Sequence, residues 1–116
     1  MPCGGEKTRI RHYPPGEFIL RQGDEVSRVC ILLKGSTKHF VITPNGVYYL
    51  IYVSSPGDLL GELEVFHHFP VKHNIQALTD CETLEIDGED FIRWLAEGKD
   101  FALFCFRHIT SKVYQS

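Results

Sequence analysis

The chain has 116 residues, of which 43% are hydrophobic, and a formal net charge of −3 at pH 7. This length allows one domain with an ordinary hydrophobic core, and no uncharged apolar run approaches the length of a membrane span. The negative charge argues against direct nucleic-acid binding, which usually needs a basic surface. The N-terminus has no charged-then-apolar leader, so we expect a cytoplasmic protein without membrane association.

Four cysteines are spread along the chain without a Cys-x-x-Cys pair: Cys3, Cys30, Cys81 and Cys105. Cys30 lies in an apolar run and Cys105 lies between two phenylalanines, so we expect buried free thiols, as in a reducing compartment. A zinc or iron–sulfur site would need clustered ligands, and we therefore expect no metal. Cys3 is near the N-terminus and is the one thiol that we expect to be exposed and reactive.

Residues 18–86 are predicted to form β-strands. The stretch EFILRQGDE is apolar at its start and closes at the turn signal Gly23-Asp24. The run VCILLKGS is almost continuously apolar and ends at Gly35, which is typical of a strand buried on both faces. The segment HNIQALTDCETLEID predicts two further strands.

The clearest feature is a predicted hairpin in KHFVITPNGVYYLIYV, which turns at Pro44-Asn45-Gly46. Asn-Gly supplies the positive φ angles that tight hairpin turns require. Many short strands separated by Gly, Pro, Asn and Asp predict a mainly β fold, either a β-sandwich or a jelly-roll barrel.

Beyond residue 86 the pattern changes to helix. Asp87 is the expected N-cap of a helix that runs from about residue 88 or 89 to Leu95, and Gly98 ends it. Asp100 then opens a second helix that runs toward Val113. The chain stops partway along this helix without a Gly or Pro signal, so we expect a truncated protein.

The second helix is apolar on two faces. Phe101, Phe104 and Cys105 form one of them, and the other comprises Ala102, Phe106, Ile109 and Val113. We expect one face to cover the β-strands and the other to meet a partner helix in a homodimer, because so short a chain has little core in which to bury this surface. The alternative is that both faces pack within one chain.

A short helix is also predicted in SPGDLLGELEVF. Gly57-Asp58 turns the chain, and Gly61 is expected to open a helix that ends at Phe66. Free backbone N–H groups and the positive end of the helix dipole favour an anion, such as phosphate, at such a start. Glu62 lies at this helix start, where one interpretation is that it caps local backbone N–H groups.

Three stretches resemble the effector domain of the catabolite-activator and fumarate–nitrate-regulator (CRP/FNR) superfamily, which has the cyclic-nucleotide-binding fold. They are YPPGEFILRQGD at residues 13–24, ILLKGS at residues 31–36 and PGDLLGELEVF at residues 56–66, and the resemblance extends from about Arg11 onward. It implies a jelly-roll (double-stranded β-helix) barrel with short flanking helices over residues 1–98. Residues 99–116 would then start a C-terminal dimerisation helix, and the helix-turn-helix DNA-binding domain that follows in the family is absent from this chain.

The resemblance also implies a ligand site in the family's phosphate-binding cassette. Glu62 matches the position that hydrogen-bonds the ribose 2′-hydroxyl. Glu64 departs from the family, because cyclic-nucleotide binders have a small residue there. Lys72-His73-Asn74 stand where those binders have Arg, then Ser or Thr, then Ala, and lysine offers a point charge in place of a bidentate fork. The expected ligand-binding residues are Gly61, Glu62, Leu63, Lys72, His73 and Asn74.

We therefore expect a ligand-sensing effector domain of a bacterial CRP/FNR-like transcription regulator, which relays its state through the C-terminal helix and touches DNA only through the absent domain. The pocket has three alternative states. It binds an anionic small molecule other than a cyclic nucleotide, it binds cAMP or cGMP through the lysine, or it is vestigial and regulation depends on Cys3 or on protein abundance.

Two other classes are considered: a stand-alone cyclic-nucleotide-binding module and a cupin-like metal enzyme. A cupin site would need an His-x-His pair, which does not occur in the sequence. His39 is alone in a strand, and His67 and His68 are expected to be solvated. We find no Walker loop and no Ser/His/Asp or Cys/His signature, so we expect no catalytic residues and no enzyme activity.

Overall fold

The computed structural model describes residues 8–98, 100, 103 and 107. Eight strands and two helices lie in this part of the chain, and they confirm the mainly β prediction. Their order is β1 (Thr8–Tyr13), β2 (Phe18–Leu20), β3 (Arg28–Lys34), β4 (Thr37–Ile42), β5 (Tyr48–Ser54), β6 (Leu59–Leu60), α1 (Glu62–His67), β7 (Asn74–Ala77), β8 (Cys81–Asp87) and α2 (Gly88–Glu97).

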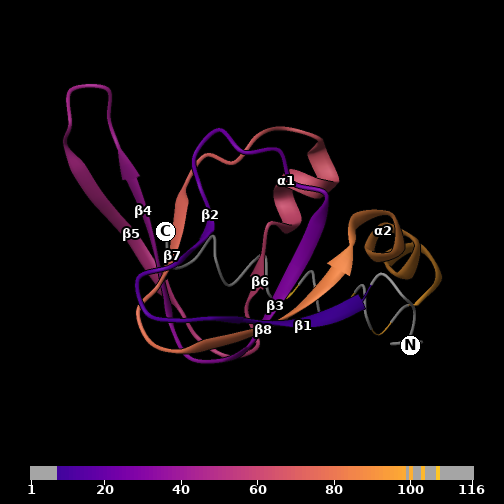
Figure 1. Cartoon of the computed structure of the whole chain (residues 1–116). Helices are drawn as coiled ribbons and strands as arrows, with labels where there is room; N and C mark the ends of the chain where they lie inside the picture. Colours follow the sequence, from indigo (N-terminus) through magenta and orange to yellow (C-terminus); the bar gives the residue numbers. More distant parts are fainter. Residues whose placement is uncertain (1–7, 99, 101–102, 104–106, 108–116) are drawn as a thin grey trace.

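The strands form two antiparallel sheets of a jelly roll. Sheet A has the order β1-β8-β3-β6, and sheet B has the order β2-β7-β4-β5. Strands that follow one another in the chain belong to different sheets, except for the pair β4 and β5. The two sheets therefore face each other across one interior. Figure 1 shows β4 and β5 extending beyond the rest of sheet B as a projecting hairpin.

The strands β3 and β8 of sheet A are largely buried on both faces. The outer face of the sheet packs against the helices, in a cluster that joins Val29 and Ile86 to Phe91 and Trp94 of α2. Its inner face meets sheet B in two clusters. The first joins Leu32, Tyr13 and Cys81 to Ala77, and the second joins Cys30 and Leu60 to Ile75.

The strand β3 has the two buried faces that its apolar run predicts, except at its end. Val29 to Leu32 are buried or nearly so, whereas Leu33 is 45% exposed. Beyond Leu32 the pairing with β8 shifts register, so the last residues leave the interior.

The predicted hairpin is present as β4 and β5, but its turn differs from the prediction. Gly46 has a φ of 86°, whereas Asn45 does not have a positive φ, so the expectation of two such residues was wrong. The amide of Gly46 donates to the carbonyl of Thr43 (2.9 Å), which closes a four-residue turn. This longer connection needs a left-handed residue only at its last position.

The helix boundaries agree with the sequence signals. The Asp87 side chain accepts a hydrogen bond from the Glu89 amide (3.2 Å), which confirms the predicted cap of α2. The amide of Gly98 donates to the carbonyl of Trp94 at the other end. The strand β1 was not predicted. None of the helices in residues 8–98 combines the length and apolarity that a membrane crossing requires.

The predicted dimerisation helix is not tested. Of residues 99–116, the structure describes only Asp100, Leu103 and Arg107. The two terminal cysteines and the four residues of the expected dimer face lie outside the described residues: Cys3, Cys105, Ala102, Phe106, Ile109 and Val113.

Candidate functional site

Gly61 begins the predicted short helix and has a backbone conformation that favours glycine. Its φ is 85°, and a Cβ atom there would lie 3.3 Å from both the Arg28 carbonyl oxygen and Val26 Cγ1. A side chain would therefore meet both backbone strain and close contacts. This tight approach holds the start of α1 against the loop between β2 and β3. Glu62, the first residue of α1, is buried, and Leu63 is 38% exposed.

Lys72 and His73 lie in the loop before β7. Lys72 is exposed, and its Nζ lies 4.9 Å from the centre of the Phe69 ring, a cation–π contact. His73 is partly buried. The lysine stem is flexible, so its ammonium group can leave Phe69 for an anion nearby.

Asn74 is engaged within the protein. Its Oδ1 accepts a hydrogen bond from the Gln22 amide (2.9 Å), and its Nδ2 donates to Gln22 Oε1 (2.7 Å). Gln22 Oε1 also accepts from the Ile42 amide (3.1 Å). Asn74 therefore ties the loop after β2 to β4, which is a positioning role beside the predicted site.

The residues next to the two groups of predicted residues meet in the interior. Leu60 comes directly before Gly61, and Ile75 comes directly after Asn74. Leu60 and Ile75 belong to the same buried cluster. The chain thus brings the cassette start and the segment before β7 to one end of the space between the sheets.

The same interior contains buried polar side chains that are not among the predicted ligand-binding residues. His39 is opposite Ile75 in the pairing of β4 with β7, so the two side chains share the inner face of sheet B. Its Nε2 is 2.5 Å from Ser54 Oγ, and its ring stacks on Tyr52 with centroids 4.1 Å apart. The sequence does contain a signal for this inward position of His39, because Thr37 and His39 alternate with outward-facing residues along a predicted strand.

Two further hydroxyl groups are buried in this interior. The Oγ1 atoms of Thr37 and Thr83 have no hydrogen-bond partner within the described part of the chain. Thr37 lies opposite Ala77, and Thr83 lies opposite Leu32, and both of these partners point inward. A buried hydroxyl without a partner is unfavourable, so a polar ligand that reached it would recover a hydrogen bond.

A buried charge lies on the inner face of sheet A, and it is fully paired. Glu85 is 4% exposed, and it accepts hydrogen bonds from Arg9 Nε (2.7 Å) and the Tyr13 hydroxyl (3.2 Å). Burial, and then the negative charge of Glu85, raise the pKa of the Cys30 thiol to about 12. Burial likewise raises the pKa of Tyr13. The bonds of Arg9 and Tyr13 to Glu85 join β1 to β8.

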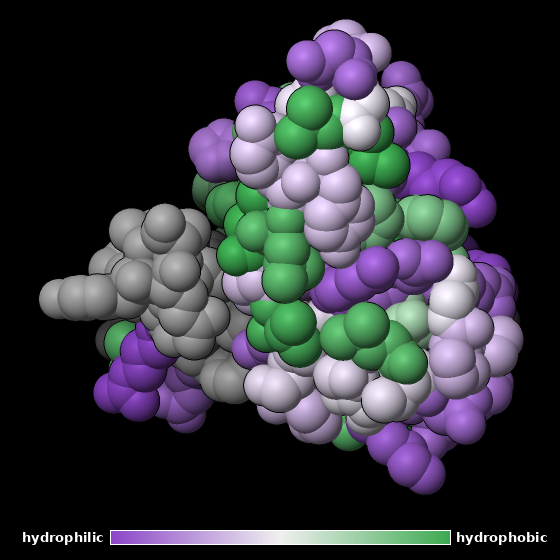
Figure 2. Space-filling view, turned by 90° about the vertical axis from the view of Figure 1, so that its left-hand side faces the viewer, coloured by the Kyte–Doolittle hydropathy of each residue, from purple (hydrophilic) through white to green (hydrophobic). Residues whose placement is uncertain are grey.

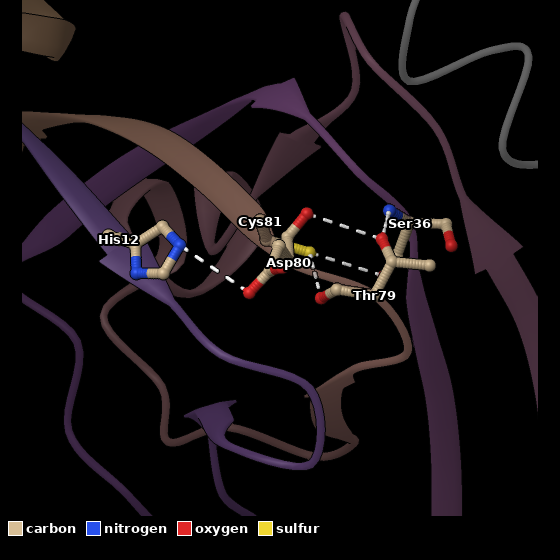
Figure 3. A network of polar contacts seen from close by, with 5 residues as sticks. All are labelled: His12, Ser36, Thr79, Asp80 and Cys81. Atoms are coloured by element: carbon tan, nitrogen blue, oxygen red, sulfur yellow. Dashed lines mark hydrogen bonds and ion pairs between the residues drawn. The ribbon is translucent and has the colours of Figure 1, made fainter.

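The cysteine at the start of β8 is also structural. Figure 3 shows Cys81 beside Ser36 and Thr79, where its Sγ donates to their carbonyl oxygens at 3.2 and 3.3 Å. The Ser36 amide donates to Thr79 Oγ1 (3.1 Å), and His12 lies 3.6 Å from Asp80. The network joins two turns, and Cys81 is completely buried. Cys30 and Cys81 are thus the buried free thiols that the sequence predicts.

A cavity of about 430 Å³ lies beside α1. Its wall includes Glu64, Glu25, His68 and Phe69, and none of the six predicted residues. Within the described residues, no group of three His, Cys, Asp or Glu side chains is arranged to hold a metal ion.

Comparison with known proteins gives a family match. The family described as "Cyclic nucleotide-binding domain" matches residues 10–97. The CRP-like cAMP-activated global transcriptional regulator of Mycobacterium tuberculosis is 25% identical over 90 residues, which are 78% of this chain and 40% of that protein. The chain thus spans about two fifths of the length of this curated relative.

Solved structures share the fold. The catabolite activator protein of Thermus thermophilus has a TM-score of 0.81 at 21% identity, over 94% of this chain and 51% of that one. The c-di-GMP-responsive regulator CLP of Xanthomonas campestris has a TM-score of 0.85 at 16% identity, over 94% of this chain and 56% of that one. At these identities the likeness concerns the fold, and it confirms the jelly roll.

Proposed function

Because this chain belongs to the cyclic nucleotide-binding domain family, we propose that it is a ligand-sensing regulatory domain of the CRP/FNR form. Its effector is a small anionic molecule of the cyclic-nucleotide class. The effector binds between the cassette that starts at Gly61 and the segment Lys72–Asn74.

The observation that carries this proposal is the backbone of Gly61. A left-handed glycine packed against the Arg28 carbonyl disfavours a side chain here, and it precedes a helix that begins directly after the interior strand β6. We place the anion at the backbone N–H groups that follow Gly61, because such groups are good partners for an anion. The convergence of Leu60 and Ile75 supports the same location.

We propose a different contact with the ligand for each polar side chain of the site. Lys72 supplies the positive charge for the anion after its ammonium leaves the Phe69 ring. Glu62 accepts a hydrogen bond from a sugar hydroxyl, as the family resemblance implies. His73 donates a hydrogen bond to the ligand. Thr37 or Thr83 takes up a polar group of the ligand that reaches further into the interior.

The relay to other parts of a regulator is proposed on the family's pattern. The curated relative is named as a cAMP-activated transcriptional regulator, and we propose that this chain acts in the same class. Ligand state would reach a DNA-binding domain through the C-terminal helix of a homodimer, with the dimer face at residues 102–113. An effector shifts such an equilibrium only by its different affinity for the two states.

The test is a calorimetric titration of the domain with cAMP, cGMP and inorganic phosphate at pH 7. We expect one nucleotide to bind with micromolar affinity, and Lys72→Ala to weaken it about tenfold, because a phosphate contact is lost. Lys34→Ala is the matched control, since Lys34 is also exposed but lies on β3. Equal affinities of wild type and Lys72→Ala would remove the lysine from the site.

A second candidate effector is an anion other than a cyclic nucleotide. The observation that favours it is Lys72, because a lysine charge selects phosphate geometry less than the family's arginine does. In that case the nucleotides give no heat, whereas another anionic metabolite in a thermal-shift panel raises the melting temperature of wild type but not of Lys72→Ala. Stabilisation of both variants alike would count against the cassette.

A further inference from the structure

The outer face of the projecting hairpin is apolar and exposed. The register pairs three residues of β4 with three of β5, and the side chains of these pairs lie on one side of the hairpin. We call these six residues the hairpin face: Lys38, Phe40, Ile42, Tyr48, Leu50 and Val53. Ile42, Tyr48, Leu50 and Val53 are each about half exposed. Figure 2 looks onto this side of the molecule and shows hydrophobic residues gathered on it. The outer face of a two-sheet protein is normally polar.

Two cations lie on aromatic rings of this region. Lys38 Nζ is 5.0 Å from the centre of the Phe40 ring and 5.4 Å from that of Tyr48. The Arg21 guanidinium lies 4.0 Å from the Phe18 ring, which in turn contacts Phe40. Among the described residues neither cation has a carboxylate within ion-pair distance. The surface is therefore apolar with a positive border.

We propose that the hairpin face docks an amphipathic segment of another protein, whose apolar side chains cover Leu50 and Tyr48 and whose carboxylates pair with Lys38 and Arg21. The four half-exposed side chains present about 400 Å², a patch size that is often functional on a monomer. Such an area on each side suits a transient interface.

Charge complementarity selects this occupant over a second copy of the chain. The hairpin face contains no acidic residue, so two copies face to face would bring their cations together without any counter-charge. A partner that carries carboxylates pairs both cations and also steers its own approach.

A single-stranded nucleic acid also binds sheets with aromatic and basic side chains. Here Phe40 is only 4% exposed, and the two cations already cover rings on which bases would stack. The net charge of −3 also opposes a polyanion. An acidic polypeptide is therefore the better fit.

The probe is a synthetic helical peptide with leucines at positions i, i+3, i+4 and i+7 and glutamates beside them, and its control peptide has lysines in place of the glutamates. We expect the glutamate peptide to bind the full chain more tightly than the lysine peptide. Leu50→Glu should weaken it at least tenfold, and Lys38→Glu about fivefold with a gain for the lysine peptide. Ile10→Glu is the matched control, because Ile10 is 63% exposed on sheet A.

Sedimentation of each variant and a titration with oligo-dT complete the experiment. Equal binding of the two peptides, no binding, or no effect of Leu50→Glu would each overturn the proposal. A wild-type dimer that Leu50→Glu dissociates would identify a second copy as the occupant instead. Binding of oligo-dT that Lys38→Glu abolishes would identify nucleic acid. None of these results depends on whether the cassette binds an effector.

Discussion

The two sheets of this domain share one interior but differ on their outer faces. Sheet A is covered by α1 and α2, and its buried carboxylate, Glu85, is paired with basic and hydroxyl groups. Sheet B leaves the hairpin face open in the described part of the chain, and Lys38 there lies over the rings of Phe40 and Tyr48. We therefore expect the covered part of sheet A to serve stability on both of its faces, whereas the outer face of sheet B carries a proposed contact with another protein.

The largest expected difference is in the effect of the same truncation on the two sheets. Leu32→Ala on sheet A should lower the free energy of unfolding by about 3 kcal/mol, because Leu32 is completely buried and its loss leaves a cavity. Leu50→Ala on sheet B should change it by less than about 0.5 kcal/mol, since Leu50 is 55% exposed. Urea denaturation followed by the fluorescence of the buried Trp94 measures both. Comparable losses would mean that something covers Leu50.

A smaller effect is expected when the buried charge of sheet A is removed. Glu85→Gln should cost about 2 kcal/mol, because the Tyr13 hydroxyl and Arg9 lose a charged acceptor. Glu82→Gln on the same strand is the control, and it should cost less than about 0.5 kcal/mol at a more exposed position. If both variants have wild-type stability in urea, the carboxylate does not hold β1 to β8.

The inner face of sheet A should also make stability depend on alkaline pH. Burial raises the pKa of Cys30 from 9.0 to about 12 and also raises that of Tyr13. The unfolded chain therefore releases these protons at lower pH than the folded chain. The free energy of unfolding should be steady below pH 9 and fall between pH 9 and 12, by up to about 1.4 kcal/mol per pH unit for each group.

Urea denaturation at pH 8, 9.5 and 10.5 measures this slope. In Cys30→Val the fall above pH 9 should be shallower than in wild type, because one of the two groups is gone. An identical slope in both proteins would contradict the assignment of the raised pKa to the Cys30 thiol.

The smallest expected effect concerns the hydroxyl groups of Thr37 and Thr83, which have no hydrogen-bond partner among the described residues and lie on the inner faces of the two sheets. Thr83→Val and Thr37→Val should each raise the free energy of unfolding by up to about 1 kcal/mol, because valine has the same shape without a polar atom to bury. Similar gains in the two variants would show that a buried hydroxyl has the same energetic cost on the inner face of either sheet. A loss of more than about 1 kcal/mol in either variant would reveal a partner for that hydroxyl.

Much of the fold could be predicted from local pattern, since an apolar run or a cap has its cause in neighbouring residues. The strand β1 has no such cause. Its sequence TRIRHY has one fully buried residue, Tyr13, so no apolar period marks it. Its pairing depends on β8 and on the contact of Arg9 with Glu85, which are 76 positions apart. The length of the turn at Gly46 could not be predicted for the same reason, because it depends on the residues at which β4 and β5 stop pairing.

The candidate site divides in the same way. Gly61 and α1 could be predicted because a glycine before a short helix is a local signal. The role of Asn74 could not, because its partner Gln22 lies 52 positions away. His39 was judged as an isolated histidine, and only the pairing of β4 with β5 brings Ser54 and Tyr52 to it.

The most direct measurement of the central claim is a ¹H–¹⁵N NMR titration of the domain with cAMP and, in parallel, with cGMP. The account predicts that one of them causes saturable shifts in the backbone amides of Gly61–Leu63 and Lys72–Asn74, while Leu50 and Ile10 stay unchanged. Shifts confined to the hairpin face or to the cavity beside Glu64 would contradict it, as would the absence of any shift with these nucleotides and with the anion that gives the largest stabilisation.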